Sequence, residues 1–549
     1  MEFKKNQIVE LYIDDIGNEG EGIGHIDGYA LFLKDAVIGD KVRAKIIKTK
    51  KNYGFARVEE VIEASKDRVS PRCSKARQCG GCTLQHLAYE KQLEYKFNKV
   101  KNCLERIGGL ENIEEKMEPI LGMEEPFYYR NKAQFPVGYD KEGNLITGFY
   151  AGRTHHIIDC THCMIQHPVN EQILLKVLDY MKKNNITAYD EKTHKGLVRH
   201  IVTRVGFKTG EIMVCLVVNG SKKNLRNLEM LVDSLTEVEG MTSICVNINK
   251  EKTNRILGSK IEEVYGKPYI YDYIGNVKYQ IGPLSFFQVN PTQTKVLYEK
   301  AMEYADLKGE ETVWDLYCGI GTISLFLAQK AKKVYGVEIV KEAIDDARLN
   351  AKMNGFDNAE FFVGKAEEVL PREYEKNGVY ADTIVVDPPR KGCDSKLLET
   401  MVKMAPKRIV YVSCDPATLA RDLKVLSEQG YEVEKVCAVD QFSHSSHVET
   451  VVLLSQQKPD DTIEIDLDLD ELDATSAELK ATYQEIKDYV LKEFGLKVSN
   501  LYISQIKRKC GIEVGENYNL PKTENPKVPQ CPKEKEEAIK AALKYFAMI

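Results

Sequence analysis

The alternation of apolar and polar positions changes along the chain. Over roughly the first 60 residues it has a period of two, broken by glycine turns, which predicts a small five-stranded antiparallel barrel. Strand-like apolar runs, such as residues 196–220, fill the segment from about 118 to 285. After about residue 290, apolar strand-like runs alternate with helical periodicity, which is typical of a parallel sheet with crossover helices.

These changes predict a multidomain protein, as the length of 549 residues also suggests. The expected fold is an N-terminal OB-like β-barrel, an α+β central domain, an α/β Rossmann-like domain and a small C-terminal extension whose role the sequence does not define. The expected ranges are 1–62 for the barrel, 63–117 and 118–285 for the central domain, 286–454 for the Rossmann-like domain and 455–549 for the extension.

Composition narrows the class of protein. Hydrophobic residues make up 43% and charged residues 29% of the chain, which is ordinary for a globular protein. No apolar run approaches the ~18 residues of a membrane-spanning helix, and the first residues lack the apolar stretch of a signal peptide. We therefore expect a cytoplasmic protein without a membrane partner, and we expect it to be a monomer.

The positions of the charged residues are more informative than the net charge. The formal net charge of −6 gives no argument for a nucleic-acid partner, but eight acids lie within residues 460–473 of the extension alone. Residues 41–57 of the barrel contain seven cations and no acid, interleaved with Tyr53 and Phe55. Small barrels bind single-stranded nucleic acid through such residues, although a solvated strand face would give the same pattern.

A glycine turn after residue 312 predicts a nucleotide-type cofactor site. An apolar strand ends in Asp315, the turn contains Gly319 and Gly321, and a second strand ends in Glu338. This is the first βαβ unit of a Rossmann-like sheet, in which an acid after the second strand accepts hydrogen bonds from a ribose. The third glycine of a dinucleotide fingerprint is missing, and the run DLYCGIGT resembles the S-adenosylmethionine (AdoMet) loop of methyltransferases. An ordinary Rossmann turn would leave Glu338 unexplained.

Asp387-Pro388-Pro389 follows a further apolar strand. Such a motif resembles that of amino-methyltransferases, which place an aromatic residue next to stack on the target base. Here Arg390 follows instead, which weakens the case for N-methylation. Two prolines also form a rigid turn for structural reasons alone.

Cys414 follows a fourth apolar strand and is the candidate nucleophile. The C5 atom of a pyrimidine is a poor nucleophile, and a thiolate that adds to C6 makes C5 reactive toward a sulfonium methyl group. A base must then remove the C5 proton. Glu449, flanked by His444 and His447, is the candidate base. The competing interpretations are a buried structural cysteine and a solvated carboxylate at a strand end.

Fourteen cysteines are many for a reducing compartment. Cys73, Cys79 and Cys82 form a C-x5-C-x2-C pattern around two glycines. Zinc or an iron–sulfur cluster would each need a fourth ligand. Cys160 and Cys163 are the next candidates.

Together these motifs resemble those of a known protein family. FFQVN, DLYCGIGT, DPPRKG, SCDPATLARD and HVETVVLL, in this order, resemble the RNA uracil-C5 methyltransferase family over roughly residues 1–454. The resemblance implies that Cys414 is the nucleophile and Glu449 the base. It also implies an AdoMet site formed by Gln288, Tyr317, Glu338 and Asp387.

The barrel resembles the TRAM module, and the cysteines resemble the [4Fe–4S] ligands of the family's rRNA-directed branch. That pattern has a cysteine shortly before Ile-Gln, which favours Cys163 over Cys160 as the partner of Cys73, Cys79 and Cys82; zinc is the alternative metal. The tRNA branch typically lacks the module and the cysteines, so the resemblance implies a uridine of 23S rRNA, without identifying which one, or whether there is more than one.

Several alternatives stay open. A tRNA uridine enzyme and a cytosine-C5 RNA methyltransferase share the thiolate chemistry, although the latter typically has Pro or Thr where Ser413 precedes the nucleophile. A non-catalytic iron–sulfur RNA-binding protein is the alternative from another class. Arg130 and Lys132 are expected to contact RNA phosphates or bases, with ordinary surface charge as an equal alternative.

Overall fold

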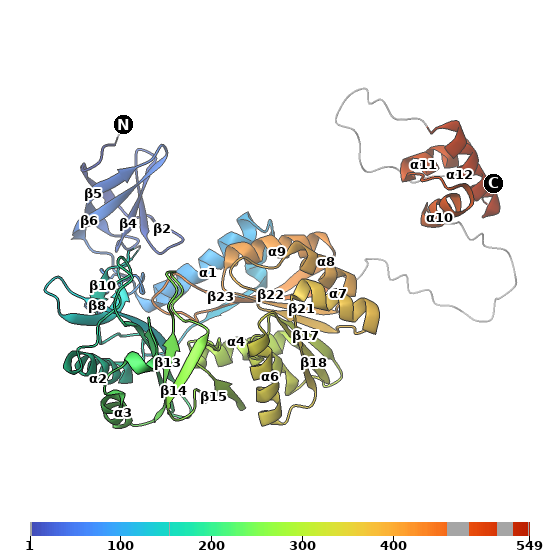
Figure 1. Ribbon diagram of the computed structural model, residues 1–549. Helices are drawn as coiled ribbons and strands as arrows, with labels where there is room; N and C mark the ends of the chain where they lie inside the picture. The colour runs from blue at the N-terminus through green and yellow to red at the C-terminus, as the bar shows by residue number, and fades with distance from the viewer. Residues whose placement is uncertain (1–2, 153, 458–482, 513–530, 547, 549) are drawn as a thin grey trace. The chain divides into compact units, whose positions relative to one another are not determined.

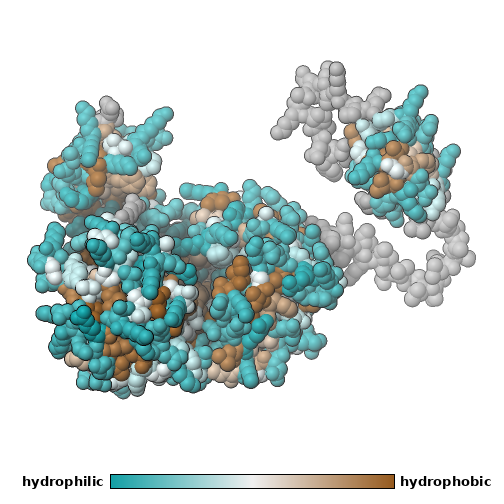
Figure 2. Space-filling view, in the orientation of Figure 1, coloured by the Kyte–Doolittle hydropathy of each residue, from teal (hydrophilic) through white to brown (hydrophobic). Residues whose placement is uncertain are grey.

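The computed structural model describes residues 3–152, 154–457, 483–512, 531–546 and 548. The chain separates into two compact units, Met1–Lys458 and Pro459–Ile549. Figure 1 shows the elements of both. Figure 2 shows hydrophilic residues over most of the visible face of the first unit, with apolar residues in scattered patches. Among the described residues, no helix is both long enough and apolar enough to cross a membrane.

The N-terminal barrel has six strands in the order β1-β5-β6-β4-β3-β2, not five. The extra strand, β2, has only two residues, too few to show a period of two. The expectation of a wholly antiparallel sheet is also wrong, because β4 and β6 run parallel. Leu31, Leu33, Val42 and Ile46 lie in its core. The strands are β1 (Ile8–Tyr12), β2 (Asp15–Ile16), β3 (Gly22–Ile26), β4 (Tyr29–Lys34), β5 (Lys41–Thr49) and β6 (Tyr53–Glu63).

The central domain is a seven-stranded sheet in the order β10-β9-β8-β11-β12-β13-β14. Ile173 and Leu174 of α2 and Leu231 of α3 share a core with apolar residues of β8 and β11, so the two helices cover one face of the sheet. A hairpin of β15 and β16 follows. The bounds are β8 (Lys132–Tyr139), β9 (Leu145–Tyr150), β10 (Ile157–Asp159), α2 (Val169–Lys183), β11 (Val198–Val205), β12 (Ile212–Val218), α3 (Leu228–Thr236), β13 (Met241–Ile248), β14 (Lys260–Tyr265), β15 (Ile270–Ile274) and β16 (Val277–Ile281).

The third part is an eight-stranded sheet in the order β19-β18-β17-β20-β21-β23-β22-β7. Its first five strands are parallel, and β23 runs antiparallel to β21. Separate apolar cores cover its two faces. The bounds are α4 (Pro291–Ala305), β17 (Thr312–Leu316), α5 (Thr322–Ala328), β18 (Lys333–Glu338), α6 (Lys341–Asn354), β19 (Ala359–Val363), α7 (Ala366–Asn377), β20 (Thr383–Val386), α8 (Ser395–Met404), β21 (Arg408–Ser413), α9 (Pro416–Glu428), β22 (Tyr431–Val439) and β23 (Glu449–Gln456).

Two early elements belong to this late sheet. Helix α1 (Tyr89–Arg106) contributes Val100 and Leu104 to one of its cores, and strand β7 (Met117–Leu121) pairs in parallel with β22. A short 3-10 helix, η1 (Ile113–Lys116), joins them. The sequence had assigned this segment to the central domain, because hydrophobic periodicity does not tell which distant sheet a strand joins.

The second unit is a small helical module with its own core. Its described helices are α10 (Tyr483–Phe494), α11 (Asn500–Lys509) and α12 (Lys533–Tyr545). Ile486, Ile503 and Ile539 are fully buried between them, and the Ser499 hydroxyl accepts a hydrogen bond from the Tyr502 amide at the start of α11. The acidic stretch 460–473 lies outside the described residues.

Candidate active site

The strand register brings the predicted residues to one edge of the eight-stranded sheet. Strands β17, β18, β20 and β21 are parallel neighbours, so their carboxyl ends share that edge. Strand β23 runs the other way, and Ser413 pairs with Thr450. Cys414, just after β21, therefore lies at the level of Glu449, the first residue of β23.

Four charged or titratable side chains meet at this edge. Burial raises the pKa of Glu449 well above its usual range, and the nearby carboxylate of Asp387 raises it further. Burial likewise raises the pKa of Asp387. The pKa of the Cys414 thiol rises to about 11, mainly through burial and also through the nearby carboxyl groups of Glu449 and Asp387. Arg390 acts in the opposite direction and lowers the pKa of both Cys414 and Glu449. Arg390, which the sequence treated only as a departure from another motif, is thus the cation of the site.

The expected cofactor loop has unusual backbone geometry. Tyr317, Gly319 and Gly321 have φ angles of 69°, 54° and 81°, in the left-handed region that a tyrosine rarely adopts. The Glu338 carboxylate accepts hydrogen bonds from the amides of Gly319 (3.3 Å) and Val340 (3.0 Å). The turn and the acid that the sequence predicted as partners are therefore held together.

Asp315 and Gly336 lie near the loop but were not predicted as site residues. Burial raises the pKa of Asp315 to about 7, and the Ser324 hydroxyl donates to its Oδ2 at 2.5 Å. A Cβ at Gly336 would lie 2.5 Å from the Phe361 ring and 3.0 Å from Cys318 Sγ. Glycine at 336 therefore allows β18 to approach the loop, a role that the sequence signals only as a glycine inside a strand.

Gln288 lies on the segment that joins the central domain to the Rossmann-like domain. It is 8% exposed, and its carbonyl oxygen accepts a hydrogen bond from Asn131 Nδ2 at 2.9 Å. Phe286, two residues earlier, is 68% exposed although it is a large aromatic residue. The segment thus places one buried amide and one exposed ring close together in sequence.

Comparison with known proteins decides the family. The family model described as tRNA (uracil-5-)-methyltransferase matches residues 88–457, and the TRAM domain model matches residues 2–58. The chain belongs to the tRNA (uracil-5-)-methyltransferase family. The protein is thus an AdoMet-dependent RNA methyltransferase of the uracil-5 family with an N-terminal TRAM domain, as the motifs predicted.

Proteins with similar sequences are also described as RNA methyltransferases. An uncharacterised RNA methyltransferase of Clostridium tetani is 53% identical, covering 82% of this chain and 97% of the relative. One of Halalkalibacterium halodurans is 52% identical with the same coverage. Among solved structures, the Pyrococcus abyssi tRNA (uracil-54, C5)-methyltransferase in complex with S-adenosyl-L-homocysteine has 29% identity and a TM-score of 0.66, covering 81% of this chain and all of that one.

The loop before Glu449 is fastened to other parts of the methyltransferase. Asp440 is fully buried, pairs with the buried Lys96 of α1, and accepts hydrogen bonds from the hydroxyls of Tyr89 and Ser443, each at 2.7 Å. His444, at φ 65°, is buried, and burial lowers its pKa to about 4. It is therefore neutral near pH 7 and is not the cation of the site.

The cysteine-rich segment contacts the same loop. The amides of Thr83 and Leu84 donate to the His444 carbonyl oxygen at 2.9 and 3.0 Å. These residues directly follow Cys82. The cysteine-rich segment is thus hydrogen-bonded to the loop that ends at Glu449.

The structure gathers the predicted cysteines from two distant segments. Cys79 and Ala151 form an antiparallel bridge. The pKa of the Cys82 thiol rises to about 12 through burial, and nearby Cys73, Cys79 and Cys163 raise it further. Burial likewise raises the pKa of the Cys163 thiol to about 11, although nearby backbone amides oppose the rise. Over the described ranges, no three His, Cys, Asp or Glu side chains are placed to hold one metal ion.

The basic stretch of the TRAM barrel is partly neutralised. Arg43 pairs with Glu10 at 2.9 Å and also with Glu60, and Lys41 pairs with Glu63 at 3.4 Å. The acids come from neighbouring positions of the sheet, outside the stretch that has none. The aromatic rings form a cluster, in which the centroids of Phe32, Tyr53 and Phe55 lie 5.7 to 5.8 Å apart. Such rings suit base stacking.

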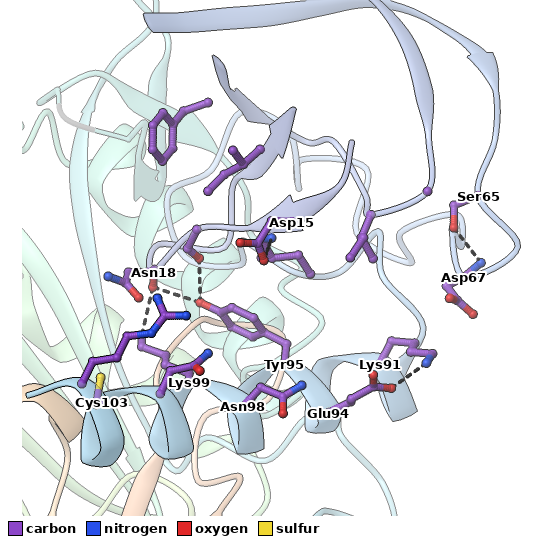
Figure 3. A pocket seen from close by; sticks show the side chains of 18 of the residues that line it. Asp15, Asn18, Ser65, Asp67, Lys91, Glu94, Tyr95, Asn98, Lys99 and Cys103 are labelled. Carbon is purple, nitrogen blue, oxygen red and sulfur yellow. Dashed lines mark hydrogen bonds and ion pairs between the residues drawn. The ribbon is translucent and has the colours of Figure 1, made fainter. Parts of the chain in front are cut away.

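A cavity of about 860 Å³, lined by both polar and apolar residues, lies between the barrel and α1 (Figure 3). The Tyr95 hydroxyl donates to the carbonyl oxygens of Gly17 and Asn18 at 2.9 and 3.0 Å. Lys99 Nζ donates to the carbonyl oxygens of Asn18 and Ser446, each at 2.9 Å. Lys99 therefore links the barrel to the loop before Glu449.

Proposed function

We propose that this protein transfers the methyl group of AdoMet to C5 of a uridine in 23S rRNA, with Cys414 as nucleophile and Glu449 as base. The observation that carries the proposal is the register of β21 against β23, which brings a thiol and a buried carboxyl group to the same sheet edge. A buried carboxyl group with a raised pKa is well suited to accept a proton.

The proposed reaction has two covalent stages. The Cys414 thiolate adds to C6 of the uracil, and an electron pair develops at C5. This pair attacks the methyl group of AdoMet, the methyl–sulfur bond breaks, and S-adenosylhomocysteine is the leaving group. Glu449 then removes the C5 proton, the C5–C6 double bond re-forms, and the C6–S bond breaks to release the thiolate. The Arg390 cation favours the thiolate form of Cys414.

The same sheet edge supports the proposed cofactor site. Glu338, already oriented by the backbone amides of Gly319 and Val340, would accept hydrogen bonds from the AdoMet ribose. Tyr317, Gln288 and Asp387 are proposed to complete the site, as the family resemblance implies. A target uridine in folded RNA must be unstacked to reach Cys414, at a cost of about a few kcal/mol.

Large-subunit rRNA is the favoured substrate because the chain carries both the TRAM domain and the cysteine-rich segment. A tRNA uridine is the second candidate, since the Pyrococcus abyssi structure is that of a tRNA enzyme. Mass mapping of modified uridines should separate them. We expect 5-methyluridine to disappear from 23S rRNA, and not from tRNA, in cells without this gene. Loss from tRNA alone would refute the rRNA assignment, and a loss of 5-methylcytidine instead would favour the cytosine alternative.

We propose that Cys73, Cys79, Cys82 and Cys163 hold a [4Fe–4S] cluster with a structural role. Cys163 is favoured over Cys160 as the fourth ligand, because the Cys160 thiol donates to the His162 carbonyl oxygen at 3.3 Å. Zinc, which takes four tetrahedral cysteine or histidine ligands in structural sites, is the alternative metal for the same residues.

Metal content tests this proposal directly. Protein purified without oxygen should contain iron and sulfide and show broad absorbance in the near-ultraviolet and visible range. Cys163→Ser should lose most of the iron, whereas Cys160→Ser should retain it. Stoichiometric zinc without iron in the wild type would overturn the cluster assignment, and the reverse result for the two variants would exchange their roles.

A further inference from the structure

Two cations face each other on the central sheet. Lys132 of β8 and Arg204 of β11 are direct partners in the antiparallel register, which places their Cβ atoms about 5 Å apart on the same face. Like charges in such a pair destabilise a sheet. Arg130, two residues before Lys132, adds a third positive charge that affects the pKa of Lys132. Such a cluster needs a compensating interaction.

Among the described residues, no carboxylate forms an ion pair with this cluster. Arg204 is 2% exposed; one guanidinium nitrogen donates to the Ser285 carbonyl oxygen. Its Nε is buried and has no hydrogen-bond partner among the described residues. Burial, Arg204 and Arg130 lower the pKa of Lys132 to about 7, and the Cys215 thiol is the one group that opposes them. The cost of burying these charges is therefore not recovered within the described part of the chain.

The cluster lies beside the proposed cofactor and substrate site. Asn131, between Arg130 and Lys132, donates from its backbone amide to the Val289 carbonyl oxygen at 2.8 Å and from its side chain to the Gln288 carbonyl oxygen. Arg204 contacts the same segment at Ser285. Arg130 and Lys132 are half-buried, and Arg204 lies buried beside Lys132.

We propose that Arg130, Lys132 and Arg204 bind a phosphodiester group of the substrate RNA, next to the target nucleotide. The inference rests on the proposed function, because that function brings an RNA strand to this segment. Guanidinium and ammonium groups are the usual partners of phosphate oxygens. The buried Arg204 adds positive charge behind the two half-buried cations, and the phosphate supplies the charge that offsets all three.

The other anion available at this site is the carboxylate of AdoMet. The amino-acid end of AdoMet also carries an ammonium group, and its sulfur is a cation. Both positive charges would be brought toward three cations of the protein, which opposes binding there. A phosphodiester has no such cationic neighbour, and RNA is therefore the favoured source of the anion.

The salt dependence of RNA binding tests the proposal. The binding of the full-length protein to a uridine-containing 23S rRNA fragment is measured by fluorescence anisotropy over a series of salt concentrations. Lys132→Gln should reduce the slope of log affinity against log salt by about 0.7 to 1 and should weaken binding at low salt by about tenfold. Arg130→Gln should act alike, and Lys352→Gln, an exposed lysine at the end of α6, should change neither quantity.

Three further measurements keep the outcomes distinct. Thermal unfolding checks that each variant is folded, and calorimetry should give an unchanged affinity for AdoMet. Raising the pH from about 6 to about 9 should reduce the wild-type slope as Lys132 loses its proton, while Lys132→Arg should keep it because arginine stays charged. Arg204, which faces Lys132, stays charged over this range, although burial lowers its pKa to about 10.

An unchanged salt slope in folded Lys132→Gln and Arg130→Gln would overturn the proposal. A loss of AdoMet affinity with intact RNA binding would also overturn it and assign the cluster to the cofactor carboxylate. RNA binding is measured here without methyl transfer. A protein with the expected salt dependence that methylates no uridine would therefore refute the proposed function and leave the anion site standing.

Discussion

Replacing Cys414 by alanine is expected to abolish methyl transfer, with a fall in turnover of at least about 10⁴-fold. Without the thiolate, no covalent bond to C6 forms and C5 stays unreactive toward AdoMet. The measurement is the transfer of labelled methyl groups from AdoMet to a uridine-containing rRNA fragment. AdoMet affinity should be nearly unchanged, because the cofactor loop is on β17 and β18 and not on β21.

Cys510→Ala is a matched control, because this half-buried cysteine lies in the second unit. It should retain wild-type activity. Methylation by the Cys414→Ala variant would mean that another residue is the nucleophile. A wild-type protein that binds the RNA but transfers no methyl group to uridine, cytidine or tRNA would instead support the non-catalytic alternative.

Replacing Glu449 by glutamine should trap the reaction after methyl transfer. Glutamine has the shape of the buried carboxyl group but cannot accept the C5 proton, so the thiolate cannot leave. We expect turnover to fall by about 10² to 10⁴-fold and an RNA–protein adduct to accumulate. The adduct should appear as a slower band in denaturing electrophoresis.

Two control variants test whether the adduct requires Cys414 and whether the effect is specific to Glu449. The double variant Cys414→Ala with Glu449→Gln should form no adduct, because the bond requires the thiolate. Glu434→Gln, on an exposed part of β22, should behave like the wild type. If Glu449→Gln turned over normally, or lost activity without forming an adduct, Glu449 would not be the base.

Local motifs account for the part of this site that could be predicted from the sequence. The turn around Gly319, the acid Glu338 and the cysteine after β21 are each set by a strand end and the next few residues. The sheet rule then places strand ends together. The period-two pattern of the first residues and the strand–helix alternation after about residue 290 likewise predicted the TRAM barrel and the α/β fold.

Contacts between distant segments explain what was missed. Lys96 and Asp440 are 344 positions apart, and neither lies in a motif that would predict a buried ion pair. The acids that neutralise Arg43 come from other barrel strands, so a stretch without acids overstated the positive charge. The partnership of Lys132 with Arg204 depends on a register that no local pattern gives.

The pairing of β7 with β22 has a consequence for synthesis of the chain. Met117 lies beside Val436, so β7 leaves the ribosome more than 300 residues before its partner. The barrel, whose strands are close in sequence, can form early, but the edge of the methyltransferase sheet must remain open until nearly the whole first unit is translated. Because the Lys96–Asp440 pair closes at the same late stage, a nascent chain becomes a competent enzyme only after β22 and β23 have emerged.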